Sequence, residues 1–257
     1  MNNPNFKHQD PSNLRSMLDN SSQDPSKGNW KHLEQYVNFA PRSQVLDFCI
    51  ALSAHIPGNI IEFGVAYGDS TKVIRNSLQR HQKFGFYSAK QIFACDSFEG
   101  LREKFENAEV GTFACEPPKI PGVKIVKGYF EDSLTPELAR TVGKVSFAHL
   151  DADLYSSTYC ALTWLTPLLQ TGSLLLFDEF LGENQSEKRA FLDWLAATGI
   201  KTVLIAEFGR EPSGWGETTD RRLVYQVIKD ETVAIKPVSL RAKLISKLRA
   251  YRQKLGV

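Results

Sequence analysis

The feature that most constrains the fold is an apolar run that ends in a glycine turn, within residues 59–70. Asn59–Phe63 predicts a buried strand, Gly64 and Gly68 bound the turn, and a helix follows with Asp69, Ser70 or Thr71 as its cap. Glycine permits positive φ and close backbone approach, and the free N–H groups of a helix start favour an anionic group. The spacing differs from the dinucleotide Gly-x-Gly-x-x-Gly pattern. It predicts a cradle for a nucleotide-type cofactor, with a mere tight connection as the alternative.

Strand-type apolar runs alternate with helical patterns after this turn. That alternation predicts an α/β fold with a mostly parallel sheet and helices on both faces. The expected strands are Asn59–Phe63, Gln91–Cys95, Lys124–Lys127, Val145–Leu150, Ser173–Phe177, Thr202–Glu207 and Arg222–Ile228. The expected helices are Trp30–Phe39, Arg42–His55, Thr71–His81, Thr158–Leu169 and Ser186–Thr198.

The length of 257 residues and the hydrophobic fraction of 42% suit one α/β domain with additions. We expect a flexible polar arm at 1–29, a helical cap at 30–58, the α/β domain at 59–236 and a basic tail at 237–257. The tail is compatible with an amphipathic helix or with a solvated, frayed end. The segments Glu103–Val123 and Phe208–Asp220 interrupt the strand-helix rhythm, as lids or as surface insertions.

The charge balance is nearly neutral, with 31 Lys and Arg against 29 Asp and Glu. It gives no argument for a nucleic-acid or anionic-membrane partner. The four cysteines form no Cys-x-x-Cys pair, so we expect free thiols in a reducing compartment and no structural zinc. The amino terminus has no apolar signal core and no run is long enough to span a membrane, so a cytoplasmic location is expected.

Acidic residues follow three of the predicted strands. Asp96 ends the second strand, where an acidic side chain in a doubly wound fold accepts hydrogen bonds from ribose hydroxyls. Asp151 and Asp153 lie two residues apart after the fourth strand, so both can face one crevice with His149 behind them. A solvated strand-end acid is the alternative at each position.

Asp178 and Glu179 end the fifth strand. The carboxyl ends of parallel strands meet at one edge of a sheet, so this pair should approach Asp151 and Asp153. Their mutual repulsion must be offset by a cation, a raised pKa or nearby basic residues. Oxygen ligands without thiolates favour Mg²⁺, Ca²⁺ or Mn²⁺ over zinc. A metal-free acid/base site remains the alternative.

The order of these motifs resembles the macrocin O-methyltransferase family over Trp30 to Ile228. The segments that carry the resemblance are Glu62–Ser70, Asp96–Leu101, Gly128–Leu134, His149–Thr158 and Phe177–Phe180. The resemblance implies a Rossmann-like class I methyltransferase with a seven-stranded sheet and an antiparallel last strand. It also implies an S-adenosylmethionine-dependent enzyme that methylates sugar hydroxyls in natural products with the help of Mg²⁺ or another hard divalent cation.

The resemblance implies roles for individual residues. The implied cofactor-binding residues are Glu62, Gly64, Gly68, Ser70, Asp96, Ser97, Gly128, Asp132 and Asp151. The implied metal ligands are Asp151, Asp178 and Glu179. Asp153 is the expected general base, and His149 is the alternative base or simply a hydrogen-bonded strand residue. Two positions depart from the family pattern, since Glu179 stands where Asp is usual and Ala152 where Gly is frequent.

The acceptor is expected to be a small-molecule hydroxyl compound, most plausibly a glycoside, and the chain could form a homo-oligomer. A catechol-like or other vicinal diol needs the same chemistry and stays open as the acceptor. A non-catalytic cofactor-binding protein, a nicotinamide-dependent oxidoreductase and a nucleic-acid methyltransferase are the remaining alternatives. The acidic cluster, the glycine spacing and the neutral charge balance disfavour them in turn.

Overall fold

The computed structural model describes residues 38–82, 89–105, 107–182, 184–209 and 221–228. The predicted polar arm, the basic tail and most of the Phe208–Asp220 segment lie outside these residues. The strands are β1 Asn38–Phe39, β2 Asn59–Phe63, β3 Ile92–Asp96, β4 Val123–Lys127, β5 Val145–Leu150, β6 Leu174–Phe177, β7 Lys201–Gly209 and β8 Arg221–Ile228. The helices are α2 Arg42–Leu52, α3 Asp69–Gln82, α4 Phe130–Ser133, α5 Pro136–Val142, α6 Tyr155–Leu165 and α7 Ser186–Thr198.

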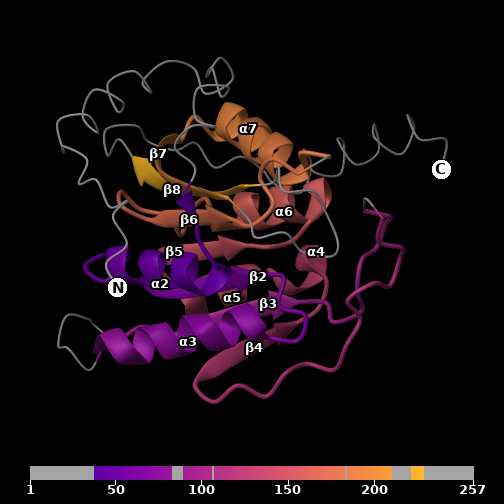
Figure 1. The fold of residues 1–257 in the computed structure, drawn as a ribbon, viewed down its shortest axis with the longest axis horizontal. Helices are drawn as coiled ribbons and strands as arrows, with labels where there is room; N and C mark the ends of the chain where they lie inside the picture. The colour runs from indigo at the N-terminus through magenta and orange to yellow at the C-terminus, as the bar shows by residue number, and fades with distance from the viewer. Residues whose placement is uncertain (1–37, 83–88, 106, 183, 210–220, 229–257) are drawn as a thin grey trace, which may run out of the picture.

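All the described strands belong to one sheet, in the order β1-β7-β8-β6-β5-β2-β3-β4 (Figure 1). Only β8 runs against its neighbours, pairing antiparallel with both β6 and β7. The predicted Rossmann-like fold with an antiparallel last strand is therefore confirmed. The sheet has eight strands rather than the expected seven, because the two residues of β1 add an edge strand beside β7.

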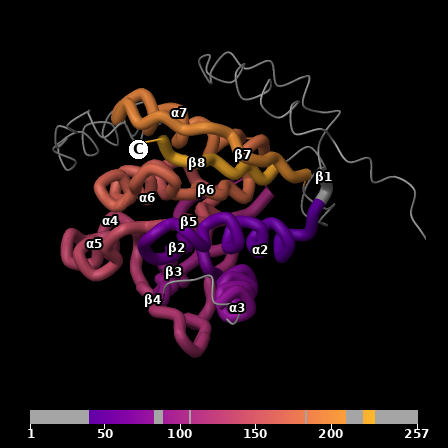
Figure 2. The backbone as a smooth tube through the Cα atoms, turned by 90° about the vertical axis from the view of Figure 1, so that its left-hand side faces the viewer, coloured from indigo at the N-terminus to yellow at the C-terminus, as the bar shows by residue number. Residues whose placement is uncertain are grey.

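Helices cover both faces of the sheet, and each face has its own apolar core (Figure 2). On one face, α2 and α3 pack through Leu46, Ile50 and Ile74 against Phe147 of β5. On the other face, α4 to α7 contribute the larger core. Side chains alternate in direction along a strand, which is why neighbouring apolar residues of β2 enter different cores.

Some predicted element boundaries were wrong. The described end of the expected helix Trp30–Phe39 is a strand, because Asn38 and Phe39 pair with the distant β7. The helix expected at Thr158–Leu169 begins three residues earlier, at Tyr155, and ends at Leu165. Helix α5 was not predicted, although Thr135 caps it and Pro136 occupies its first position.

The sequence signal for this helix was therefore local capping chemistry. Its seven residues are too few for a clear 3.6-residue period to stand out.

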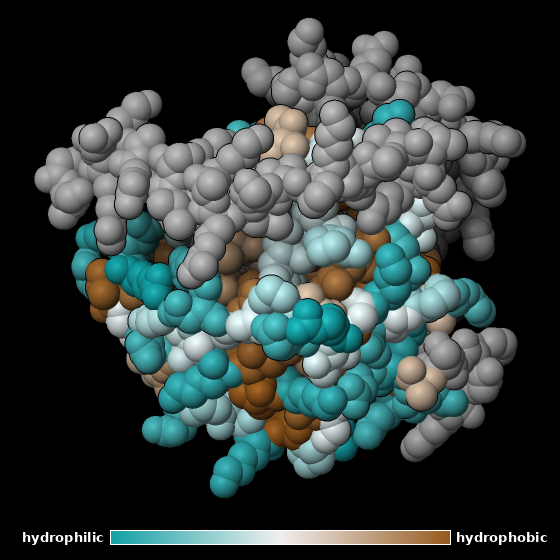
Figure 3. Space-filling view, turned by 180° about the vertical axis from the view of Figure 1, so that it is seen from behind, coloured by the Kyte–Doolittle hydropathy of each residue, from teal (hydrophilic) through white to brown (hydrophobic). Residues whose placement is uncertain are grey.

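The surface of the described residues can be followed on one face of the molecule. The face in Figure 3 mixes hydrophilic and hydrophobic side chains in small patches. Among the described residues, no helix is long and apolar enough to cross a membrane. All four cysteines are free, as expected. The most informative features lie instead at the carboxyl ends of β2, β3, β5 and β6.

Candidate active site

A cavity of about 400 Å³ opens at the carboxyl ends of the parallel strands. This is the edge at which α/β sheets bind ligands. Loops after β2, β3, β4, β5 and β6 line it. The lining residues are Arg42, Gly64–Tyr67, Asp69, Ser70, Asp96, Ser97, Gly100–Arg102, Phe113, Tyr129–Glu131, Asp151–Leu154, Ser157 and Glu179.

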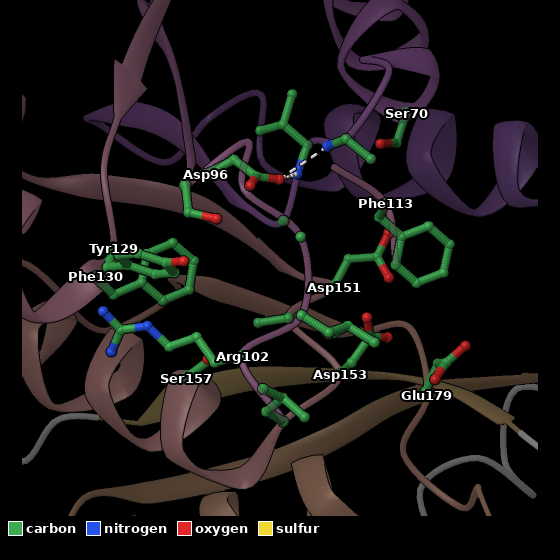
Figure 4. Close-up of a pocket in the computed structure, with 18 of the residues that line it drawn as sticks. Ser70, Asp96, Arg102, Phe113, Tyr129, Phe130, Asp151, Asp153, Ser157 and Glu179 are labelled. Atoms are coloured by element: carbon green, nitrogen blue, oxygen red, sulfur yellow. Dashed lines mark hydrogen bonds between the residues drawn. The ribbon is translucent and has the colours of Figure 1, made fainter. Parts of the chain in front are cut away.

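The glycine turn after β2 is fixed by the carboxylate of Asp96. One oxygen of Asp96 accepts the backbone N–H groups of Val65 and Ala66, at 2.7 and 2.9 Å (Figure 4). The other oxygen accepts the N–H group of Phe98 at 2.8 Å. Ala66 has a left-handed φ of 43°, which costs a non-glycine residue roughly 1–2 kcal/mol. These bonds to a charged acceptor stabilise that unfavourable turn.

Gly64 lies where the turn after β2 meets the loop after β5. Its φ is +87°, and an added Cβ would lie 1.7 Å from the carbonyl oxygen of Asp151. Glycine is therefore required here by the close approach of two protein segments. At Gly68 an added Cβ would meet Ile120 and Pro118, at 2.8 and 2.9 Å. Both glycines have the positive φ that the sequence analysis expected. The atoms that leave no room for a side chain at these positions belong to the protein rather than to a ligand.

One end of the cavity is aromatic. The guanidinium of Arg102 stacks on the Tyr129 ring with its carbon 3.4 Å from the ring centre, and also contacts Glu131 at 3.2 Å. Phe130 lies beside this pair and is buried by the core beneath (Figure 4). Such flat, partly apolar surfaces suit the face of a planar ring.

The other end of the cavity is acidic. Asp151, Asp153 and Glu179 gather there, with the Phe113 ring nearby (Figure 4). Asp153 is hydrogen-bonded to Glu179, and burial together with the charges of Glu179 and Asp151 raises the pKa of Asp153 well above its usual range. Burial likewise raises the pKa of Asp151, and the positive charge of Arg42 lowers it in part.

The loop containing the acidic residues differs from the expected strand geometry. β5 ends at Leu150, and Asp153 has a left-handed φ of 56°. Both Asp151 and Asp153 nevertheless face the cavity, because the chain turns sharply between them. The prediction that both aspartates face one crevice was therefore correct, but the strand alternation given as its reason was wrong.

A chain of buried charges lies beneath the acidic end. His149 is fully buried, with Nδ1 2.9 Å from Glu62 and Nε2 3.7 Å from Asp178. Burial lowers the pKa of His149, but the hydrogen bond to Glu62 and the nearby carboxylates of Asp178 and Asp151 outweigh it and raise the pKa to about 9. Glu62 also accepts a hydrogen bond from Thr71 of α3. The imidazole ring therefore lies between two buried carboxylates, with its Nδ1 in hydrogen-bond contact with Glu62 and its Nε2 without a hydrogen-bond partner among the described residues.

Asp178 is surrounded by cations. Although fully buried, it accepts hydrogen bonds from Arg222 Nε at 2.7 Å and from Arg42. Burial alone would raise its pKa, but Arg42, His149 and Arg222 together hold the pKa of this carboxyl well below its usual range. Arg42 also contacts Asp151, with Nη1 and Oδ2 3.2 Å apart. A single guanidinium thus links the loops after β5 and β6.

The cavity brings together seven of the residues proposed from the sequence. These are Gly64, Ser70, Asp96, Ser97, Asp151, Asp153 and Glu179. Six others do not line it: Glu62, Gly68, Gly128, Asp132, His149 and Asp178. Glu62, His149 and Asp178 have no solvent exposure and lie beneath the cavity floor.

The expected metal ligands do not form a coordination site in this arrangement. Asp151 and Glu179 line the cavity, but Asp178 is buried behind them and is bound by two arginines. Arg42 occupies the space between Asp151 and Asp178 that a shared ion would need. Within the part of the chain that the structure describes, no group of three or more His, Cys, Asp or Glu residues is arranged to hold a metal.

Several functional residues were not predicted. They include Arg42, Arg102 and Phe113 in the cavity wall. Glu187 was also missed. It is fully buried, its pKa is raised well above its usual range by burial, and it accepts the backbone N–H group of Glu179 at 3.0 Å. An acid in the first turn of α7 was a visible signal for this residue. Arg42 had no comparable local signal, since its partners lie more than a hundred residues away.

The chain is similar to known methyltransferases. Residues 61–180 match the family model described as a methyltransferase domain. One similar protein is 8-demethyl-8-(2,3-dimethoxy-alpha-L-rhamnosyl)-tetracenomycin-C 4'-O-methyltransferase of Streptomyces olivaceus, 27% identical over 52% of this chain and 58% of its own length. Another is demethyldecarbamoylnovobiocin O-methyltransferase of Streptomyces niveus, 22% identical over 69% of this chain and 72% of its own length.

The solved structure of the O-methyltransferase NovP shares the fold. It has a TM-score of 0.57 and 19% identity, covering 73% of this chain and 80% of its own. The chain thus spans less than two thirds of the first relative, but most of the second and of NovP. These comparisons confirm the Rossmann-like class I fold and the resemblance to sugar O-methyltransferases that the motifs indicated. They do not test the roles of individual residues.

Proposed function

We propose that the chain is an S-adenosylmethionine-dependent O-methyltransferase, because residues 61–180 match the family model of a methyltransferase domain and the sheet has the class I topology. The proposed acceptor is a hydroxyl group on the sugar of a glycosylated natural product. One observation carries this proposal. A single cavity has aromatic side chains at one end and a carboxyl of raised pKa at the other, with the glycine turn along its wall. A methyl donor and a proton acceptor can therefore meet there.

The wall of the cavity fits the proposed cofactor. S-adenosylmethionine, when bound, supplies a methyl group on a positively charged sulfur. The adenine suits the end formed by Tyr129 and Phe130, and the ribose suits the strip of Asp96 and Ser97. The positive sulfur suits the end where Asp151 and Asp153 lie. Asp96 is a positioning residue in this proposal, because its carboxylate holds the turn through hydrogen bonds. The same carboxylate can also accept hydrogen bonds from the ribose hydroxyls.

Asp153 is the proposed general base. Its raised pKa makes its carboxylate a better proton acceptor than an ordinary aspartate. Bound S-adenosylmethionine would give its methyl group to the acceptor oxygen and would leave as neutral S-adenosylhomocysteine. The hydroxyl proton passes to a carboxylate oxygen of Asp153. Holding the reactants in line contributes roughly 7–11 kcal/mol in favourable cases. We assign no proton transfer to His149, because it is buried away from the cavity.

Divalent-metal assistance is not part of this mechanism. The resemblance implies Asp151, Asp178 and Glu179 as ligands, but Arg42 already neutralises the first two. The guanidinium would have to leave before an ion could bridge them. No step is therefore assigned to a metal ion.

The acceptor class rests on two observations. Two relatives are named as O-methyltransferases, one of a rhamnosyl-bearing tetracenomycin C and the other of demethyldecarbamoylnovobiocin. In addition, two large aromatic side chains in the cavity wall, Tyr67 and Phe113, are 60% and 46% exposed. Exposed rings of this kind suit the apolar face of a sugar or an aromatic aglycone.

A methyl-transfer screen tests the proposal. Purified protein would be incubated with S-adenosylmethionine and a panel of rhamnosyl and other glycosides, with vicinal diols as a second panel. We expect a product heavier by one methylene unit, formed with an equal amount of S-adenosylhomocysteine. Asp153→Asn should reduce turnover by about a hundredfold while cofactor affinity changes little. The control variant Glu109→Gln alters an exposed carboxylate outside the cavity.

Methylation of diols but not glycosides would favour the alternative acceptor. Cofactor binding without any transfer would favour the non-catalytic alternative. A cytoplasmic location, the assembly state, the absence of a nucleic-acid partner and the domain boundaries stay predictions.

A further inference from the structure

Arg42 occupies an unusual place for an arginine. It is the first residue of α2, where the helix dipole favours acidic side chains and disfavours cations. The first turn of α2 contains no acidic residue. The helix therefore gains nothing electrostatically from Arg42, and the stabilisation must come from elsewhere.

That stabilisation comes from Asp151 and Asp178. Nη1 of Arg42 is 3.2 Å from Asp151, and Nη2 donates a hydrogen bond to Asp178. The two aspartates are neighbours across β5 and β6 and would otherwise repel each other at the cavity floor. The planar, forked guanidinium can serve two carboxylates at once, which a compact ammonium does less well.

The carboxylate of Asp178 already has two arginine partners. It accepts hydrogen bonds from Arg42 on one side and from Nε of Arg222 on the other, and Arg42 also contacts Asp151. A divalent ion placed between Asp151 and Asp178 would meet the positive charge of Arg42 directly. It would also approach the positive charge of Arg222. Binding would therefore require removal of at least one of these cations.

We propose that Arg42 is the resident cation of this site, and that its contacts to Asp151 and Asp178 exclude a divalent ion from the two carboxylates. The inference corrects the metal set implied by the sequence resemblance. It concerns the same cavity as the proposed function and deepens it. Arg42 lines the cavity, so its guanidinium also presents a fixed positive charge to the acceptor oxygens.

Manganese binding tests this inference directly, since Mn²⁺ accepts the same oxygen ligands and is visible by electron paramagnetic resonance. The full chain would be titrated with Mn²⁺ beside Arg42→Met and the control Arg140→Met, which removes an exposed arginine. We expect wild type and Arg140→Met to bind Mn²⁺ equally weakly, and Arg42→Met to bind about tenfold or more tightly. Adding Asp151→Asn to Arg42→Met should abolish that gain.

Equal or weaker binding by Arg42→Met would overturn the inference, and so would tight binding by wild type that Asp151→Asn removes. Arg42→Lys serves as a second variant if Arg42→Met fails to fold, because one ammonium cannot hold both carboxylates equally well. It should give an intermediate gain in Mn²⁺ affinity, and no gain would count against the inference. Calorimetry with S-adenosylhomocysteine keeps the two proposals apart. If the wild-type protein did not bind S-adenosylhomocysteine, the proposed function would be refuted, but the comparison of Mn²⁺ affinities would still be valid.

Discussion

Replacing Asp96 with asparagine tests whether the cavity wall depends on a carboxylate. The two oxygens of Asp96 accept three backbone N–H groups, from Val65, Ala66 and Phe98. Asparagine keeps one oxygen, and its amide N–H group would face at least one of these donors. A hydrogen bond to a charged group contributes roughly 1.5–3 kcal/mol. Because Asp96 is partly exposed, we expect the free energy of unfolding to fall by about 2–3 kcal/mol.

Urea denaturation gives the free energy of unfolding, and calorimetry gives the affinity for S-adenosylhomocysteine. Affinity should fall together with stability, because the same turn forms the cofactor wall. The control is Glu137→Gln, in which an exposed carboxylate becomes an amide. Its stability should stay within about 0.5 kcal/mol of wild type. If Asp96→Asn were as stable as this control but lost cofactor binding, Asp96 would act on the ligand alone and our structural reasoning would be refuted.

Three further predictions concern other parts of the site. Gly64→Ala should lower the free energy of unfolding by about 3 kcal/mol or more in urea melts, because its Cβ would lie 1.7 Å from the Asp151 carbonyl. His149 gains protons on folding because its pKa rises from 6.5 to about 9, so its stabilisation is complete below pH 6.5 and is lost towards pH 9. Between these pH values, wild type should lose about 3 kcal/mol more stability than His149→Gln. Phe113→Ala should raise the KM for the acceptor about tenfold and leave the KM for the cofactor unchanged in steady-state assays.

Matched controls separate these effects from general damage. Gly122→Ala places a side chain at a similar φ of +81° in open space, so it should cost only about 1 kcal/mol. A loss as large as that of Gly64→Ala would show that φ, not the clash, decides. His55 is exposed, and His55→Gln should keep the wild-type pH profile. Val110 is exposed outside the cavity, so Val110→Ala should leave the acceptor KM unchanged, and a matching rise would remove Phe113 from the acceptor site.

The sequence was most informative where local pattern determines structure. The buried strands β2 and β5 were predicted with their observed bounds, because both are short apolar runs bordered by polar residues or glycine. The carboxyl-edge rule likewise brought Asp96, Asp151 and Glu179 to one cavity.

The sequence was least informative where distant segments meet. β1 is a strand only because β7 lies beside it, so its local pattern suggested a helix instead. Asp178 looked like a metal ligand because nothing near it in sequence reveals Arg42 and Arg222. Burial of charge and choice of partner are tertiary properties, and a local pattern does not encode them.

A crystal structure with bound S-adenosylhomocysteine tests the central claim most directly, namely that the methyl donor and the carboxylates share one cavity. The account predicts the adenine beside Tyr129 and Phe130, and the sulfur at the end that contains Asp153. Binding of the cofactor product outside this cavity, or with its sulfur turned away from Asp153, would contradict it.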